Sequence, residues 1–479
     1  MNPADNPRNR WLALYVLCVG VLMIVLDTTI VVVALPSIQA DLQFTSTSMV
    51  WVLNAYMLTF GGFLLLGGRL GDYYGQRRWF LIGLVLFTLA SLACGLAQSQ
   101  LTLVIARAVQ GLGGAVVTAV ALSLIMGLFR EPRERAQAMG IYGFVCAAGG
   151  SIGELIGGVL TDLFGWQSIF LVNLPIGIAV YVGCLRLLPR DELPPTRGRL
   201  DVAGALTGTL GLMLAVYAVV GGNAAGWTSP QTLGLLAAAL ITLGLFLAIE
   251  ARVSEPLMPL RLFRLRNVAV ANVVGVLWAA GMFAWFVISA LYMQHVLGYD
   301  PMRVGLAFLP ADGIMALFSA GLSARMVMRF GIRGPAWIGL LVASLGLLLF
   351  ARAPVGGSFL IDVLPGMALL GLGAGMAFNP VLLAAMSDVE QSESGLASGI
   401  VNTSFMMGGA LGLAVLASIA DARTETLQLA GAEGITALNE GYRRAFLWGA
   451  ALTALGALVT ALLLRPKAGA EIGAVVAPV

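Results

Sequence analysis

Long apolar runs alternate with short polar segments along almost the whole chain. The first run extends from Trp11 to about Leu35. A helix needs about 20 apolar residues to cross a bilayer, where its backbone groups have no water to bond. The runs therefore predict fourteen transmembrane helices, near residues 11–35, 49–67, 79–98, 101–128, 136–160, 167–188, 201–221, 232–250, 267–293, 303–325, 334–352, 359–384, 395–420 and 444–464.

Two polar segments divide these spans into groups. Six spans precede RLLPRDELPPTRGRLD, two lie between it and EARVSEPLMPLRLFRLRN, and six follow. We expect an N-terminal six-helix half (1–190), a two-helix insertion with flanking cytoplasmic loops (191–260) and a C-terminal six-helix half (261–479). Glycine-rich segment 111–115 is echoed by 371–375, and loop 68–78 by 321–333. Two parallel repeats of this kind are one architecture of secondary transporters.

The 27 Lys and Arg residues are distributed by membrane side. With the N-terminus inside, most of them fall in cytoplasmic segments, which retain positive charge. Those in outward loops are Arg303, Arg352, Arg423, Arg443 and Arg444. The first apolar run is longer than the core of a signal peptide and has no obvious cleavage site. We therefore expect a multi-pass protein of the bacterial cytoplasmic (inner) membrane, with both termini cytoplasmic.

Composition excludes several classes of function. The chain is 59% hydrophobic and 11% charged, whereas soluble domains average roughly 25% charged residues. The four cysteines lie in apolar runs without a CxxC pair or a histidine cluster, so neither a metal site nor a disulfide framework is indicated, and we expect no cofactor. The net charge of +3 is too small to suggest nucleic acid as a partner. No GxxxxGK[ST] loop is present, so we expect an ion gradient to supply the energy and no enzyme activity.

The segment between the second and third predicted spans has a distinctive pattern. It contains Gly68, Asp72, Gly75, Arg77 and Arg78 and resembles the G-x-L-a-D-x-x-G-r-r loop of major facilitator transporters. Glycines permit a tight turn here, and the charges can pair, separate and pair again as the helical bundle rocks. We therefore interpret this segment as a conformational-switch loop.

Three further motifs carry a resemblance. Segment 26–36 is similar to the first-helix signature L-D-x-T-I-V-N-V-A-L-P of the 14-helix drug:proton antiporters, with Val32 in place of Asn. Segment 107–114 resembles the fourth-helix motif that the family associates with proton transfer. Segment 149–158 resembles the fifth-helix antiporter motif G-x-x-x-G-P-x-x-G-G, with Glu154 in place of Pro. Its matching glycines are Gly149, Gly153, Gly157 and Gly158.

The resemblance covers nearly the whole chain. It implies an all-α membrane protein with the major facilitator fold, built from two six-helix halves and two extra central helices. It also implies proton-driven multidrug efflux, hence antibiotic resistance, with protons, lipophilic or cationic drugs and membrane lipid as partners. We expect a monomer, and an outer-membrane partner is left open. Because a fold alone does not fix a function, the substrate class must be argued from the buried charges.

Ionisable residues inside a membrane span are costly and point to function. Asp27 and Glu154 lie about 24 Å and 27 Å from the inner ends of their helices, and Arg107 lies about 9 Å from the outer end of its helix. All three therefore fall in the outer half of the bilayer, on helices of the N-terminal six-helix half. Protonation of either carboxylate would free Arg107, which predicts a proton-coupling site. The alternatives are a permanent ion pair around Arg107 and, for Glu154, a side chain that faces water.

Asp312 lies about 13 Å into its helix, near the middle of the membrane. It resembles the acidic position with which quaternary-ammonium exporters of this family hold cationic drugs. The preceding helix carries an aromatic set suited to flat lipophilic cations: Trp278, Phe283, Trp285 and Phe286. We predict a substrate site here, with lipid-facing bulk as the alternative for the aromatic residues.

Polar residues such as Asn54, Tyr56 and Gln110 could line a cavity or join helices by hydrogen bonds. The leading hypothesis is a proton-coupled antiporter that exports cationic drugs by alternating access. A dedicated exporter of one antibiotic or siderophore would share every motif. A membrane receptor or channel is the remote alternative, and it predicts no proton-driven flux.

Overall fold

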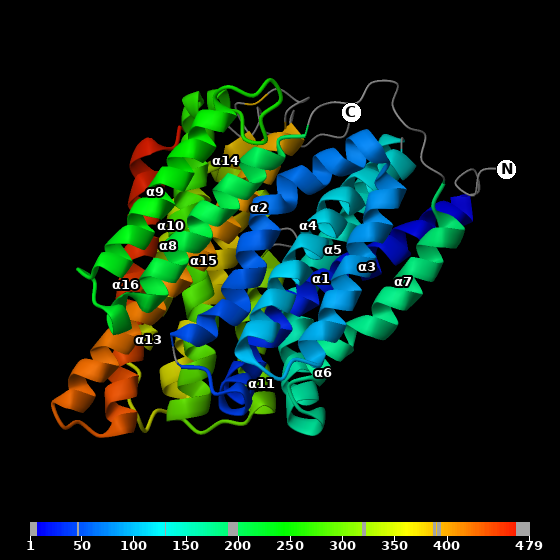
Figure 1. Ribbon diagram of the computed structural model, residues 1–479. Helices are drawn as coiled ribbons and strands as arrows, with labels where there is room; N and C mark the ends of the chain where they lie inside the picture. Colours follow the sequence, from blue (N-terminus) through cyan, green and yellow to red (C-terminus); the bar gives the residue numbers. More distant parts are fainter. Residues whose placement is uncertain are drawn as a thin grey trace.

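The computed structural model describes residues 7–45, 47–129, 131–189, 200–318, 322–386, 389 and 394–465, and all regular secondary structure in these ranges is helical. Figure 1 shows a bundle of long, roughly aligned helices. Residues 190–199 of the first polar segment and Gly321 of the repeated loop lie outside the described ranges.

The helices are α1 (Pro7–Leu42), α2 (Trp51–Tyr74), α3 (Gln76–Gly95), α4 (Gln100–Leu128), α5 (Pro132–Phe164), α6 (Ser168–Leu171), α7 (Asn173–Leu187), α8 (Val202–Ala225), α9 (Pro230–Glu250), α10 (Arg266–Leu291), α11 (Pro301–Leu317), α12 (Ser323–Phe330), α13 (Arg333–Phe350), α14 (Leu364–Met386), α15 (Ser394–Leu429) and α16 (Gly434–Leu463). Short 3-10 helices span Ser48–Val50 (η2) and Leu260–Arg264 (η3), and π-helices span Tyr292–Val296 (η4) and Phe359–Val363 (η6).

Every predicted span coincides with a long helix or with two consecutive ones. The sixth predicted span corresponds to α6 and α7, and the tenth to α11 and α12. Among the described residues, twelve helical segments are long and apolar enough to cross a membrane, and α5 and α11 fall outside that set. The count of fourteen spans therefore stays a prediction.

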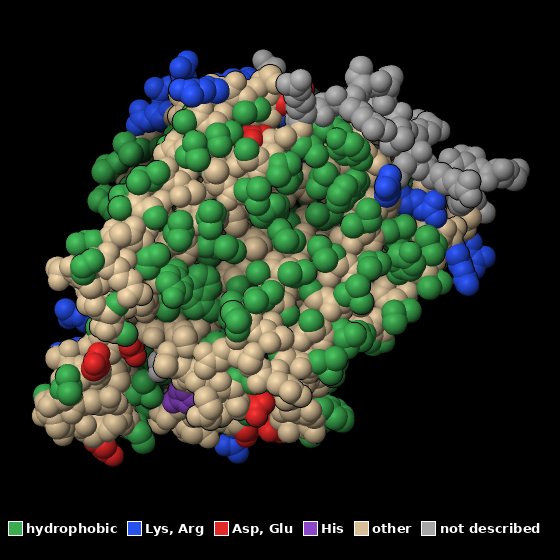
Figure 2. All heavy atoms as spheres, viewed as in Figure 1, with side chains coloured by type: hydrophobic (Ala, Val, Ile, Leu, Met, Phe, Trp, Pro, Cys, Tyr) green, Lys and Arg blue, Asp and Glu red, His purple; other side chains and the backbone are tan. Residues whose placement is uncertain are grey.

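The surface has the pattern of a membrane protein. In Figure 2, hydrophobic side chains cover the middle of the visible face. Most visible Lys and Arg side chains lie toward the end where α1 begins, which we call the proximal end, and most visible Asp and Glu lie toward the opposite, distal end. The predicted orientation assigns the distal end to the outside.

Glycines make equivalent contacts in the N-terminal group (α1–α7) and the C-terminal group (α10–α16). A Cβ on Gly111 of α4 would lie 2.5 Å from a backbone oxygen of α2, and one on Gly113 would lie 2.6 Å from a backbone nitrogen of α3. On α14, a Cβ on Gly371 would lie 2.1 Å from a backbone oxygen of α11, and one on Gly373 would lie 2.5 Å from a backbone nitrogen of α13. Such small residues let helix backbones touch in lipid.

The two groups meet along two seams. One is the packing of α5 on α11, and the other is the packing of α2 on α15. Helix α8 covers the α2/α15 seam, because it packs on both of these helices. Asn223 of α8 donates a hydrogen bond from Nδ2 to the Ser418 carbonyl oxygen of α15 at 2.7 Å. Helix α9 packs on α8 and buries few of its residues.

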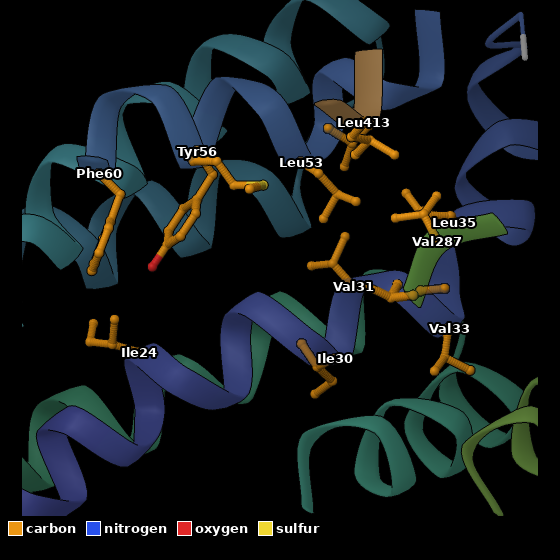
Figure 3. Packing of buried hydrophobic residues seen from close by; sticks show 14 of the residues in the cluster. Ile24, Ile30, Val31, Val33, Leu35, Leu53, Tyr56, Phe60, Val287 and Leu413 are labelled. Atoms are coloured by element: carbon orange, nitrogen blue, oxygen red, sulfur yellow. The ribbon is translucent and has the colours of Figure 1, made fainter. Parts of the chain in front are cut away.

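Apolar side chains join the groups in the distal half. Figure 3 shows Val31 and Leu35 of α1 close to Leu53, Val287 and Leu413, which come from α2, α10 and α15. All five are buried in one hydrophobic cluster. This contact holds α1 at the centre of the bundle, with its polar residue Asp27 one to two turns further toward the proximal end.

Candidate functional site

Arg107 and Asp27 form an ion pair inside the N-terminal group. Arg107 Nη1 on α4 lies 2.5 Å from Asp27 Oδ2 on α1, and both side chains have zero exposure. Arg107 Nε also donates to the Val52 carbonyl oxygen at 2.9 Å. The guanidinium carbon lies 4.3 Å from the ring centroid of Tyr56, within the range of a cation–π contact. The structure thus brings together two of the predicted coupling residues.

Three uncharged side chains complete this network. Gln110 Nε2 donates to Asp27 Oδ1 at 2.7 Å and to Ser91 Oγ at 2.8 Å. Asn173 Nδ2 donates to Asp27 Oδ1 at 2.9 Å. Sequence reasoning left the role of Gln110 open and missed Ser91 and Asn173. The available signal was a polar residue inside a mostly apolar span.

The network gives a partner to each oxygen of the Asp27 carboxylate. One carboxylate oxygen accepts two amide hydrogen bonds, and the other faces a guanidinium. A buried ion pair persists when its remaining lone pairs are satisfied, and removing one partner costs about 3–5 kcal/mol. The geometry is therefore that of a charge-compensated site built from α1, α3, α4 and α7.

Glu154 and Asp312 form a second buried site. They are 1% and 3% exposed, and their carboxyl groups lie within hydrogen-bonding reach of each other. Sequence reasoning grouped Glu154 with Arg107, because the two lie at similar depth. The structure places Glu154 against Asp312 instead, across the α5/α11 seam.

Helix periodicity explains this placement. Gly149, Gly153 and Gly157 are spaced four residues apart, and a Cβ on any of them would collide with α1. Glu154 follows Gly153 by about 100° around the helix, so it turns away from α1. Gly158 lies one turn beyond Glu154 on the same face, and it touches α11. The antiporter-like glycines therefore orient α5 so that Glu154 faces the C-terminal group.

Close backbone packing surrounds the two carboxyl groups. A Cβ on Gly158 would lie 2.6 Å from the Pro301 carbonyl oxygen, and a Cβ on Gly305 would lie 2.6 Å from the Glu154 carbonyl oxygen. The Glu154 carboxylate oxygens receive no hydrogen bond from a fixed donor in the described part of the chain. An ionised carboxylate only accepts hydrogen bonds, so a bond between these two groups requires a proton on one of them.

The predicted aromatic residues fall into two clusters. Trp278 packs on Phe405 of α15 with ring centroids 5.4 Å apart, and Phe283 packs on the same ring at 5.8 Å. Trp285 and Phe286 pack on Phe308 of α11, at 5.9 Å and 5.7 Å.

The second aromatic cluster lies beside the carboxyl pair. Phe308 precedes Asp312 by one helical turn, so the two side chains share a face of α11. Trp278 and Trp285 are 3% and 2% exposed, so neither faces lipid. Phe308 and Phe405 were missed, because they lie on helices other than α10, and only the packing of α11 and α15 brings them to its aromatic residues.

The predicted switch loop forms the turn between α2 and α3. Gly75 has φ +103°, a conformation that favours glycine. Arg77 Nη2 donates to the Leu185 carbonyl oxygen of α7 at 2.8 Å, and Asp72 lies beside Arg69.

Further contacts tie this turn to its surroundings. Arg69 Nη1 donates to Tyr73 Oη at 3.1 Å, and that hydroxyl donates to Glu255, beyond α9. A Cβ on Gly71 would lie 2.8 Å from Val120, so α2 and α4 touch here. Gly68 and Arg78 lie at the two sides of the turn. The loop thus links α2 and α3 to α7 and to the segment after the central helices.

Proteins similar to this chain belong to one superfamily of transporters. The profile of the Major Facilitator Superfamily matches residues 17–413. The chain is 39% identical to the puromycin resistance protein pur8 of Streptomyces alboniger, over 88% of this chain and 83% of that protein. It is 38% identical to the multidrug resistance protein Stp of Mycobacterium tuberculosis (86% and 76% covered) and to the cephamycin export protein CmcT of Amycolatopsis lactamdurans (86% and 85% covered).

A solved structure shares the fold. The POT family transporter PepTSo superposes with a TM-score of 0.68 over 96% of this chain and 98% of its own, at 16% sequence identity. The family match and the relatives place the chain among multi-pass membrane transporters and not among enzymes. The chain belongs to the major facilitator superfamily, and within it is related to drug-resistance and antibiotic-export proteins. The predicted family is confirmed.

Proposed function

We propose that this transporter is a proton-coupled antiporter that exports lipophilic, cationic drugs by alternating access. The observation that carries the proposal is the presence of two buried ionisable sites, Asp27–Arg107 and Glu154–Asp312, in a relative of named drug exporters. Buried charges are costly in a membrane protein and are retained where they bind ions or substrate. Energy then comes from protons that enter as drug leaves.

The proposed domains are two halves, residues 1–190 and 261–479, that rock about a central cavity, with 191–260 as an insertion. Both termini lie in the cytoplasm. Residues Asp27, Arg107 and Glu154 take part in proton coupling. Asp312 with the aromatic residues of α10 binds the drug, because a carboxylate attracts a cation and aromatic faces suit flat lipophilic molecules.

A dedicated exporter of one natural product is a second candidate. Relatives that are named for single compounds favour it, namely the puromycin, cephamycin and tetracenomycin C proteins. This alternative predicts one strongly preferred substrate, whereas the multidrug reading predicts comparable transport of unrelated lipophilic cations.

Purified protein in liposomes with a pH-sensitive dye inside tests the proposal. Adding a monovalent or a divalent cationic drug should move protons in the opposite direction to the drug, and a neutral drug should give a weaker response. Drug flux that ignores an imposed pH gradient would contradict proton coupling. A response to one natural product alone would favour the dedicated exporter.

A further inference from the structure

We propose that Glu154 and Asp312 form a single proton-binding latch between the two groups. A proton shared by the two carboxyl groups holds the α5/α11 seam closed. Loss of that proton leaves two facing negative charges and separates the helices. This latch deepens the proposed function, and it is a different site from the Asp27–Arg107 network.

The first support is the position of the two carboxyl groups. One comes from the N-terminal group and the other from the C-terminal group, and both are buried within hydrogen-bonding reach. By contrast, the Asp27 network uses helices of the N-terminal group alone. Only the Glu154–Asp312 pair therefore responds directly when the two groups move apart.

The second support is the absence of a compensating cation among the described residues. Helix α5 packs on α1, α4, α6 and α11, and α11 also packs on α14 and η4. Apart from the pair itself, the ionisable residues in the sequence of these elements and of α10 are Arg8, Arg10, Tyr15, Cys18, Asp27 and Asp41 (α1), Arg107 (α4), Arg133, Glu134, Arg135, Tyr142, Cys146 and Asp162 (α5), Arg266 (α10), Tyr292 and His295 (η4) and Arg303 (α11). Helices α6 and α14 carry none.

The cations on these elements lie elsewhere. Arg8 is at the start of α1, and Arg133 and Arg135 are at the start of α5, about 30 Å along that helix from Glu154. The other arginines contact Glu134 (Arg10), Asp27 (Arg107), the Leu463 carbonyl oxygen (Arg266) and Asp300 (Arg303). His295 and Tyr292 bind Tyr442 and the Pro354 carbonyl oxygen, and Asp41 accepts a hydrogen bond from Trp166. Two carboxylates that share a site without a cation cannot both ionise readily, because like charges repel strongly where water is excluded.

The third support is the enclosure of the pair on its distal side. The backbones of α5 and α11 touch at Gly158 and Gly305. Phe308, one turn nearer the distal end than Asp312, packs on Trp285 and Phe286. A proton therefore reaches or leaves the pair from the distal side only when this seam opens. That property is required of an antiporter, in which proton binding from outside should accompany closure of the outer side.

The latch makes a distinct prediction for Glu154→Gln. A glutamine amide donates a hydrogen bond to Asp312 without a titratable proton, so the seam should stay closed at every pH. Asp162→Asn is the matched control, because it makes a carboxyl-to-amide change on the same helix at an exposed position.

Spin labels at Leu163 of α5 and Leu360 of η6 report the distance between the groups at the distal end, since these positions are 65% and 70% exposed. With the full-length protein in nanodiscs and the cysteines replaced, the label distance should lengthen between pH 5 and pH 9. Glu154→Gln should abolish this lengthening, and Asp162→Asn should retain it. An unchanged distance across pH in the parent, or equal lengthening in Glu154→Gln, would overturn the latch.

A proton count separates the latch from a merely structural role. Acid–base titration of the folded, drug-free protein should show one titrating group fewer in Glu154→Gln than in the parent, and an equal count would refute the shared proton. If drug flux in liposomes remains proton-driven while Glu154→Gln leaves the pH response of the label distance unchanged, the latch fails and the proposed function stands. If the label distance changes with pH but drug flux does not depend on the pH gradient, the latch stands and the proposed proton coupling fails.

Discussion

The two buried sites of this transporter differ in how their charge is balanced. Asp27 meets a guanidinium and two amide donors within one group, whereas Glu154 meets another carboxyl group across a seam. A balanced site is held in place, because every polar atom of the carboxylate has a fixed partner. An unbalanced site changes its interactions when a proton binds or leaves. The same residue type therefore has fixed partners of opposite charge in one place and faces a like group across a helix seam in another.

The largest expected effect is that of Arg107→Ala. It leaves the Asp27 carboxylate buried without its cation, which should lower the free energy of unfolding by about 3–5 kcal/mol and abolish proton-driven efflux. Unfolding in mixed micelles and efflux from cells measure the two effects. Arg303→Ala, at a side chain that is 69% exposed, is the control. Full stability of Arg107→Ala would show that the network is not the balanced site described above.

Asp312→Asn tests whether the second buried site recognises the charge of the drug. The lost interaction scales with drug charge in a site of low dielectric constant, so divalent drugs should lose most affinity, monovalent drugs less and neutral drugs least. Binding affinities for a matched set of drugs, measured in the purified protein, check this order, and Asp312→Glu should largely restore it. Equal losses of affinity for all three kinds of drug would mean that Asp312 binds the proton and does not recognise the charge of the drug.

Glu154→Gln should flatten the pH dependence of transport, since it removes the titratable half of the unbalanced pair. Protonation closes the seam, so parent activity should change most where the pair gains or loses its proton, and the variant should show no such step. Initial rates of drug uptake into inverted vesicles at a series of external pH values, with the gradient held constant, measure this. An unchanged profile would remove Glu154 from the coupling machinery.

Gly158→Ala should disturb the unbalanced site without changing any charge. The added methyl group would lie 2.6 Å from the Pro301 carbonyl oxygen, so α5 and α11 must move apart, at a cost of about 1–3 kcal/mol. Thermal unfolding should show the loss, and the distal label distance should lengthen at every pH. Gly150→Ala, where a Cβ meets no atom within 4 Å, is the matched control and should behave like the parent.

The smallest expected effect is that of Asn223→Ala at the other seam. It removes the hydrogen bond from α8 to Ser418 of α15, which is worth about 0.5–1.5 kcal/mol. Unfolding measurements should detect this loss, while the pH dependence of transport stays unchanged because no titratable group is involved. A shifted pH profile would indicate that the two seams move together.

The helices could be predicted from the sequence. Runs of apolar residues located them, since a helix in lipid must satisfy its own backbone and carry apolar side chains. Spacing along a helix also predicted similar depths for Asp27 and Arg107, because each residue adds 1.5 Å. Two ionisable residues at one depth on helices of one group were reason enough to predict their pairing, and the structure pairs them.

Which helix faces meet depends on the packing of the whole bundle. Glu154 lies at a similar depth to Arg107, yet its partner is Asp312, because the glycines of α5 turn the opposite face toward α1. Ser91 and Asn173 became partners of Asp27 only when α3 and α7 packed beside α1. The position of a residue along a helix follows from the sequence alone. The direction in which its side chain faces matters only relative to neighbours that are distant in sequence. Contacts between such neighbours depend on the packing of the whole bundle, and no local pattern encodes them.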